Sequence, residues 1–348
     1  MNLREKILIP KMYYKSQSRV DKPNREASIL MKSKLLSQNL IVYVAFLLVF
    51  AFFSILLGDT FLSVPNILNI TRQTAMISVM AIAMTLVISS GMIDLSIGSI
   101  TALSGLVAAL ILRETNIIFL GLSGGLVIGA LIGFVNGILI TKARIPAFLA
   151  TLGTMGMVRG FAMWITDRSV VPIHNRTFNT IFGIGNIGVI PVLFFWTIFF
   201  VIVGYFLLNR LSFGRYVLAT GGNQLTAQFS GINTDRIKIK VMVLSGLFAG
   251  FAGIMYASRM QAARHTIGEG DELSVIAAVI LGGTSMAGGQ GSIVGALVGS
   301  LLVGMINNGL ILAGLDVSQQ MVIRGAIIIL ATAISNRSAL GFSSRAKV

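Results

Sequence analysis

Ten long apolar stretches, separated by short polar segments, decide what this 348-residue chain can fold into. Most approach the roughly 20 residues that an α-helix needs to cross the hydrocarbon core of a bilayer. Only 11% of the residues are charged, against about 25% in soluble domains, so lipid surrounds most of the chain. We predict an all-α, polytopic membrane protein with about ten transmembrane helices. The predicted spans are residues 39–57, 68–89, 97–112, 117–140, 146–166, 191–209, 241–260, 273–287, 291–310 and 318–335.

The charges of the connecting segments predict the orientation of these spans. With the N-terminus inside, the inner segments hold 19 Lys and Arg and the outer segments hold four. The positive-inside rule then places both termini in the cytoplasm. This topology also accounts for the net charge of +15, which in a soluble protein would indicate nucleic acid, and we expect no nucleic-acid partner.

The same pattern divides the chain into three parts. Residues 1–38 form a basic cytoplasmic arm that is disordered or lies on anionic lipid headgroups. Residues 39–336 form the transmembrane domain, with a long polar loop at 211–240. Residues 337–348 form a cytoplasmic tail.

Two pairs of segments predict an inverted repeat. Gly125–Gly133 resembles Gly291–Gly299, and upstream of them Asp94-Leu-Ser-Ile matches Glu272-Leu-Ser-Val. Five spans separate the two copies, an odd number, so the copies cross the bilayer in opposite directions. Inverted repeats are typical of transporters, whose pathway lies near the repeat interface. The regularly spaced glycines of both copies are expected mainly to allow close helix packing.

Polar residues at membrane depth are the candidates for a translocation path. Asp94 is a functional candidate because ionisable groups in membranes are costly, although a role as the cap of a helix starting at Leu95 is the favoured interpretation. Amides and hydroxyls within the spans can bind a polar solute or can join two helices, and the second role is slightly favoured for the asparagines. The candidate path residues are Asp94, Asn136, Thr151, Asn307 and Asn308.

The polar loop 211–240 contains signals for a short helix. Asn223 is a suitable N-cap, and Gly231 can end the helix in the left-handed conformation, which predicts about two turns over residues 224–230. A helix this short has little stability of its own in water. It therefore leans on the membrane domain or on a partner, unless the loop serves only to fix topology.

Three segments resemble the membrane permeases of the ribose-type family of ABC sugar importers. They read GRYVLATGGNQLTAQFSGI, AAVILGGTSMAGGQGSIVG and GMIDLSIGS, and the resemblance extends through nearly all of residues 37–336. It implies a type II-like permease fold whose short cytoplasmic helix docks into a groove on an ATPase subunit. The residues to which it assigns ATPase coupling are Gly214, Gly221, Gly222, Asn223, Ala227, Ser230 and Gly231.

The resemblance also implies a function and partners. The chain would be the permease subunit of an importer for a monosaccharide such as ribose, in the bacterial inner membrane, with a second permease copy or a paralogue. A cytoplasmic ATPase would bind ATP and Mg²⁺, and an extracytoplasmic protein would deliver the sugar. We expect no catalytic site, cofactor or metal on this chain, because it lacks a Walker lysine and hydrolytic motifs. The alternative is an ion-gradient-driven secondary transporter or channel for a small polar solute.

Overall fold

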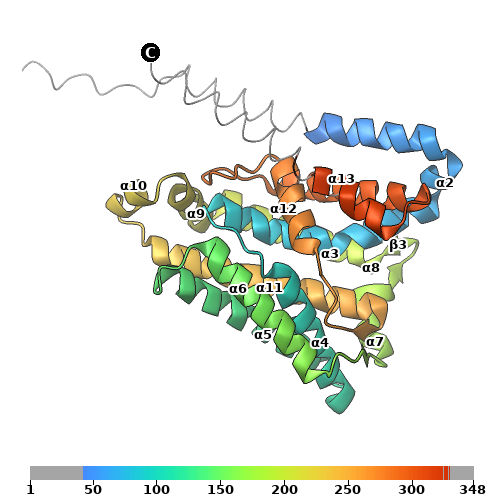
Figure 1. Cartoon of the computed structure of the whole chain (residues 1–348), viewed down its shortest axis with the longest axis horizontal. Coiled ribbons are helices and arrows are strands. Elements are labelled where there is room, and N and C mark those ends of the chain that lie inside the picture. Colours follow the sequence, from blue (N-terminus) through green and yellow to red (C-terminus); the bar gives the residue numbers. More distant parts are fainter. Residues whose placement is uncertain (1–41, 324, 328, 330–348) are drawn as a thin grey trace, which may run out of the picture. The chain divides into compact units, whose positions relative to one another are not determined.

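The computed structural model describes residues 42–323, 325–327 and 329, which are mostly helical (Figure 1). The predicted arm, the predicted tail and parts of the first and last predicted spans lie outside these residues. Helical residues recur at 317–323, after α13. The helices before them are Val42–Leu57, α2 (Asp59–Leu62), α3 (Val64–Ser89), α4 (Ile97–Thr115), α5 (Ile118–Thr141), α6 (Ala147–Ile165), α7 (Arg176–Asn179), η1 (Thr180–Ile184), α8 (Val192–Tyr205), η2 (Phe206–Arg210), α9 (Ser212–Gly222), α10 (Gln224–Phe229), α11 (Thr234–Met260), α12 (Asp271–Leu281) and α13 (Ile293–Leu312).

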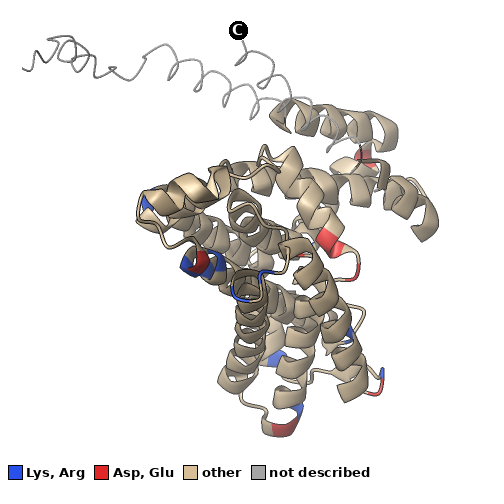
Figure 2. Cartoon of the chain, turned by 60° about the vertical axis from the view of Figure 1, so that its left-hand side comes forward, with Lys and Arg blue, Asp and Glu red and all other residues tan. Residues whose placement is uncertain are grey.

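Seven of the described helical stretches are long and apolar enough to cross a membrane. They are α3, α4, α5, α6, α8 together with η2, α11 and α13. Figure 2 shows the ribbon between the helix ends largely without charged residues. The all-α, polytopic membrane fold is therefore confirmed, while the number of ten spans and the inverted repeat stay predictions.

Some helices begin or end at other residues than the predicted spans, because local capping interactions and turns set their ends. α11 begins seven residues before the apolar window, because the side chain of Asn233 accepts a hydrogen bond from the Arg236 amide at 3.0 Å. α12 ends at Leu281, and Gly283 follows with a left-handed φ of 85°. The window predicted at 273–287 is thus a helix and a turn, which periodicity alone could not separate.

Three helices form the centre of the fold. In α3, α4 and α11, between 72% and 78% of the most apolar window is buried, against 22% to 28% in α5, α6 and α8. The outer helices expose large apolar side chains such as Phe134, Trp164 and Phe199. Since water disfavours such surfaces, these helices face lipid or another subunit.

Glycines bring α5 and α11 into backbone contact. A Cβ on Gly129 would overlap the Gly246 carbonyl oxygen, and a Cβ on Gly246 would overlap the Gly129 carbonyl oxygen. A Cβ on Gly299 in α13 would likewise overlap the carbonyl oxygen of Ala278 in α12. The close packing predicted from the glycine spacing is confirmed at these positions.

Short antiparallel strands join segments at the end of α11 that lies away from α10. β1 (Val171–Pro172) pairs with β4 (Ala262–Ala263), so the segment after α6 is tied to the end of α11. β2 (Asn186–Ile187) and β3 (Ile190–Pro191) form a hairpin before α8.

Candidate functional site

The short helix α10 begins and ends as the sequence predicts. The Asn223 Oδ1 accepts a hydrogen bond from the Thr226 amide at 3.0 Å, which caps the first turn. Gly231 follows the helix with a left-handed φ of 83°. The Gly231 amide donates to the Gln228 carbonyl at 2.9 Å, and the next amide bonds one residue further back. This pair of bonds is a Schellman motif, and it closes a helix of six residues.

The two faces of α10 differ. Leu225 is 66% exposed and Phe229 is 91% exposed, and their spacing of four residues puts them on one face of the helix. Ala227 is only 3% exposed. Ala227 therefore packs against the chain itself, and the surface that α10 offers to a partner is the apolar pair Leu225 and Phe229.

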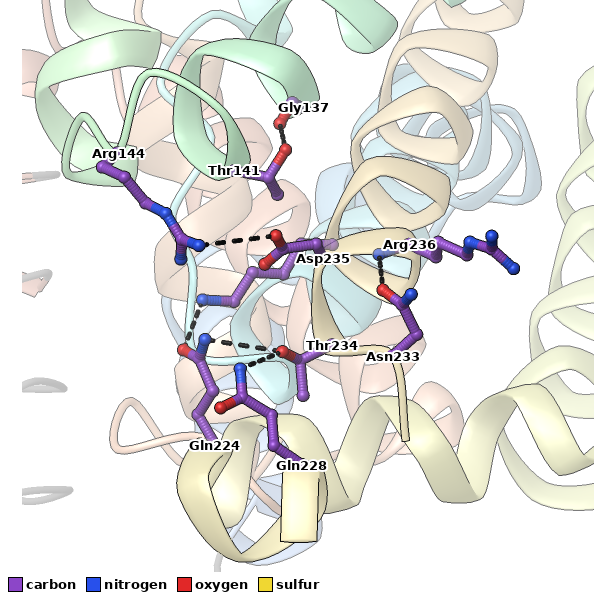
Figure 3. Close-up of polar contacts among 10 residues, drawn as sticks. Gly137, Thr141, Arg144, Gln224, Gln228, Asn233, Thr234, Asp235 and Arg236 are labelled. Atoms are coloured by element: carbon purple, nitrogen blue, oxygen red, sulfur yellow. Dashed lines mark hydrogen bonds and ion pairs between the residues drawn. The ribbon is translucent and has the colours of Figure 1, made fainter. Parts of the chain in front are cut away.

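A set of polar side chains fastens α10 to the first turns of α11 (Figure 3). We call Gln224, Gln228, Thr234 and Lys238 the polar strap. Gln228 Nε2 donates to Thr234 Oγ1 at 2.9 Å, and Gln224 Nε2 reaches the same oxygen at 3.5 Å. Lys238 Nζ donates to Gln224 Oε1 at 2.7 Å. Four side chains from two helices thus fix how α10 lies on α11.

An ion pair brings a third segment to this place. Arg144 lies in the connection between α5 and α6, and its Nη2 is 3.8 Å from Asp235 Oδ2 at the start of α11 (Figure 3). The Arg144 side chain is 71% exposed, so solvent screening leaves the pair little energy of its own. The pair therefore shows that the α5–α6 connection lies beside the start of α11, without holding it there.

The other residues predicted to couple the chain to an ATPase make different contacts. Gly214 lets α9 pack on η2, because a Cβ there would lie 2.7 Å from the Leu207 carbonyl oxygen. Gly221 and Gly222 end α9 immediately before the cap of α10. Ser230 is exposed and donates its hydroxyl to the Thr226 carbonyl at 2.9 Å.

Asp94 is completely buried in the connection between α3 and α4. Its Oδ1 accepts hydrogen bonds from the Ser96 amide at 2.9 Å and from Ser96 Oγ at 2.5 Å, and its Oδ2 accepts one from Ser245 Oγ at 2.7 Å. Burial raises the pKa of the carboxyl, and the bonds from Ser96 and Ser245 oppose that rise. The helix begins at Ile97, not at Leu95, and Asp94 orders the backbone just before it.

Asn136 and Thr151 complete this buried cluster. Asn136 Nδ2 donates to Ser96 Oγ at 2.9 Å, which joins α5 to Asp94 through one hydroxyl. Thr151 Oγ1 donates to the Ile93 carbonyl at 3.2 Å and accepts from the Leu95 amide at 3.1 Å. Three predicted path residues thus meet around one connection, where they hold helices together in this conformation.

Asn307 and Asn308 lie on α13, outside that cluster. Asn308 is buried, and its Nδ2 donates to Asn66 Oδ1 of α3 at 3.0 Å, whereas Asn307 is partly exposed. The hydrogen bonds of Asn136 and Asn308 fit the interhelical role that the sequence slightly favoured. A place for any of these residues on the translocation path stays a prediction.

Sequence reasoning missed two features of these sites. Ser245 lies in the middle of an apolar helix, and its role is to donate a hydrogen bond to Asp94. The two residues are neighbours only in the folded chain, so the sequence gives no signal for this bond. The polar strap could have been sought in the spacing of Gln224 and Gln228, which are one helical turn apart. Among the described residues, no three His, Cys, Asp or Glu side chains are grouped to hold a metal ion.

Comparison with known proteins assigns the chain to a family. Residues 66–332 match the family described as the permease component of branched-chain amino acid transport systems. The chain belongs to this permease family. No solved structure matches it.

Curated relatives match the permease over most of its length. The ribose import permease protein RbsC of Escherichia coli (strain K12) is 42% identical over 81% of this chain and 88% of its own. The L-arabinose ABC transporter permease protein AraH of Azospirillum brasilense is 39% identical, over 83% and 85%. The D-allose transport system permease protein AlsC of E. coli K12 is 35% identical, over 82% and 88%.

Proposed function

We propose that this chain is the membrane-spanning permease subunit of an ATP-driven importer for a monosaccharide. The observation that carries the proposal is the 35% to 42% identity, over more than four fifths of the chain, to permeases named for ribose, arabinose and allose. Those names favour a pentose or a similar sugar as the transported solute. They also favour the ATP-driven class over the ion-gradient alternative.

In this proposal, α10 is the contact with a cytoplasmic ATPase. Phe229 and Leu225 form an exposed apolar pair on a helix whose other face is held by the polar strap. An exposed aromatic side chain on a rigid support is suited to anchor an interface. The ATPase binds ATP and Mg²⁺ and hydrolyses the nucleotide, and this chain contributes the docking surface and the path.

The remaining assembly follows from the proposed role. A second permease copy, or a paralogue, completes the path, and an extracytoplasmic sugar-binding protein delivers the solute to the end of the molecule away from α10. The chain lies in the bacterial inner membrane among lipids, with both termini and α10 in the cytoplasm. The excess of Lys and Arg in the predicted inner segments supports this orientation.

Copurification and uptake together test the proposal. The tagged full chain, isolated from its own membrane, should retain an ATP-hydrolysing subunit. Phe229→Asp should weaken that association at least about tenfold, equivalent to roughly 1.4 kcal/mol. Phe119→Asp is the matched control, because Phe119 is 72% exposed at the far end of α5.

Uptake into vesicles then identifies the solute class. With ATP and binding protein present, labelled ribose, arabinose or allose should accumulate. Labelled leucine tests the amino acid class that the family description names. Uptake that an ion gradient drives without any bound ATPase would refute the proposed function.

A further inference from the structure

Gly221 at the end of α9 lies against the end of α3. A Cβ on Gly221 would overlap the Ser89 carbonyl oxygen. Gly91, two residues after Ser89, has a left-handed φ of 79°. A Cβ on Gly91 would lie 3.5 Å from Gly221 Cα. No side chain separates the two helix ends, so their backbones meet directly.

The loop between α12 and α13 covers the same point. Gly288 and Gly289 both have left-handed φ values, 82° and 75°, which side chains rarely adopt. A Cβ on Gly288 would lie 2.6 Å from the Gly221 carbonyl oxygen, and a Cβ on Gly289 would lie 2.8 Å from Gly222 Cα. The Gly289 amide donates to the Ser89 carbonyl at 2.9 Å.

We call these six residues, Ser89, Gly91, Gly221, Gly222, Gly288 and Gly289, the glycine junction. It joins three segments that are far apart in sequence: the end of α3, the end of α9 and the α12–α13 loop. α10 begins directly after the capping residue that follows Gly222. Side chains can change rotamer to absorb a shift, but backbone in direct contact cannot, because packed interiors leave no room.

The junction lies on the route from α10 to the centre of the fold. The end of α3 continues into the connection that Asp94 ties to Ser245 of α11 and, through Ser96, to Asn136 of α5. The α12–α13 loop leads directly into α13. A shift of α10 therefore reaches α11 through the polar strap, and it reaches α3 and the α12–α13 loop through the glycine junction.

We propose that the glycine junction positions α10 and transmits its displacement to α3 and to the α12–α13 loop at the same time. The inference rests on the proposed function, since it takes α10 as the contact with the ATPase. It gives the glycines of the GGN and AGGQG segments a mechanical role in transport. Packing alone would require them for folding but not for coupling ATP hydrolysis to uptake.

A wedge inserted after folding separates these two roles. The chain has no cysteine, so Gly222→Cys creates a single exposed thiol. A Cβ at this position makes an ordinary contact, 3.7 Å from Gly289 Cα, so the variant folds before any bulk is added. Alkylation of the assembled complex with N-ethylmaleimide then adds bulk at the end of α9, beside Gly289 of the loop.

The expected result is a loss of coupling in the alkylated complex. Sugar uptake per ATP hydrolysed should fall at least about tenfold below that of the same protein before alkylation, while the ATPase stays bound. Ala143→Cys, at an exposed position in the connection between α5 and α6, should keep its ratio of uptake to hydrolysis after the same treatment. An unchanged ratio in fully alkylated Gly222→Cys would overturn the proposal, and so would release of the ATPase, because the wedge would then act on docking.

A second variant tests the same contact without chemical modification. Gly221→Ala should lower the uptake-to-hydrolysis ratio in the protein that reaches the membrane, and a normal ratio in that folded fraction would contradict a transmitting role. Failure of the proposed function itself looks different. In that case the unmodified Gly222→Cys complex would transport no sugar at all, or would contain no ATPase.

Discussion

Single hydrogen bonds decide how the carboxyl group of Asp94 is tolerated in the protein interior, in the connection between α3 and α4. Of the described residues, none forms an ion pair with it. Ser96 and Ser245 supply the three hydrogen bonds that replace water. A buried carboxylate without such donors is far more costly than one that is fully bonded, so these hydroxyls are needed for the stability of the connection between α3 and α4.

Removing one donor should therefore destabilise the protein. Ser245→Ala removes the hydroxyl that donates to Asp94 Oδ2, and a buried acceptor left without its donor costs about 1–3 kcal/mol. Thermal unfolding in detergent should show a lower midpoint. Ser123→Ala is the control, because the partly exposed Ser123 hydroxyl donates to carbonyls of its own helix and its loss should leave the midpoint unchanged. Equal midpoints for both variants would show that the Ser245 bond contributes nothing.

At the scale of elements, α10 depends on its two ends more than on its length. A helix of six residues lies far below the length at which isolated helices persist. The Asn223 cap and the Gly231 turn close both ends, and the polar strap supplies the tertiary contact. The helix is therefore formed before any partner arrives, which lowers the entropic cost of docking.

Loss of a cap should loosen this element alone. Asn223→Ala removes the bond to the Thr226 amide, at a cost of about 1 kcal/mol, so hydrogen exchange of the α10 amides should become about fivefold faster. Gly231→Ala should act in the same direction, because its φ of 83° strains any side chain. Ser230→Ala should leave exchange in α10 unchanged. Equal protection in all three variants would mean that the caps do not hold the helix.

The sequence predicted these ends because capping is local chemistry. The residue types of Asn223 and Gly231 are enough to predict a cap and a turn, and the lengths of the apolar runs are enough to predict membrane-spanning helices. α9 was missed because its residues 212–222 mix polar, glycine and apolar positions, and only packing on η2 and on the glycine junction defines it. Which face of α10 is covered could not be predicted, since the burial of Ala227 depends on what the chain folds against, and its role in coupling stays a prediction.

For the whole molecule, orientation in the membrane is the property on which the proposed partners depend. α10 lies where α11 begins, and the β1–β4 pair lies where α11 ends. A helix of 27 residues spans about 40 Å, enough to place these two sites on opposite sides of a bilayer. The ATPase and the sugar-binding protein would then approach opposite ends of the same helix.

Thiol labelling checks this arrangement directly. In a chain with no native cysteine, Ser230→Cys should react with a membrane-impermeant reagent only from the cytoplasmic side. Thr177→Cys, an exposed position of α7, should react only from outside. Labelling of both thiols from one side would mean that α11 does not cross the membrane as proposed.

The backbone contact of α5 with α11 has a consequence for how the molecule can move. Gly129 and Gly246 meet through their backbones, while Gly125 and Gly137 of α5 lie against the side chains of Ile254 and Ile239 of α11. The seam is therefore keyed, and α5 cannot slide along α11 without lifting both isoleucine side chains out of the notches that the glycines leave. The hydrogen bond from Asn136 of α5 to Ser96 adds a polar tie to the same centre. A displacement of α11 would thus carry α5 with it, and the two helices would travel as one rigid pair.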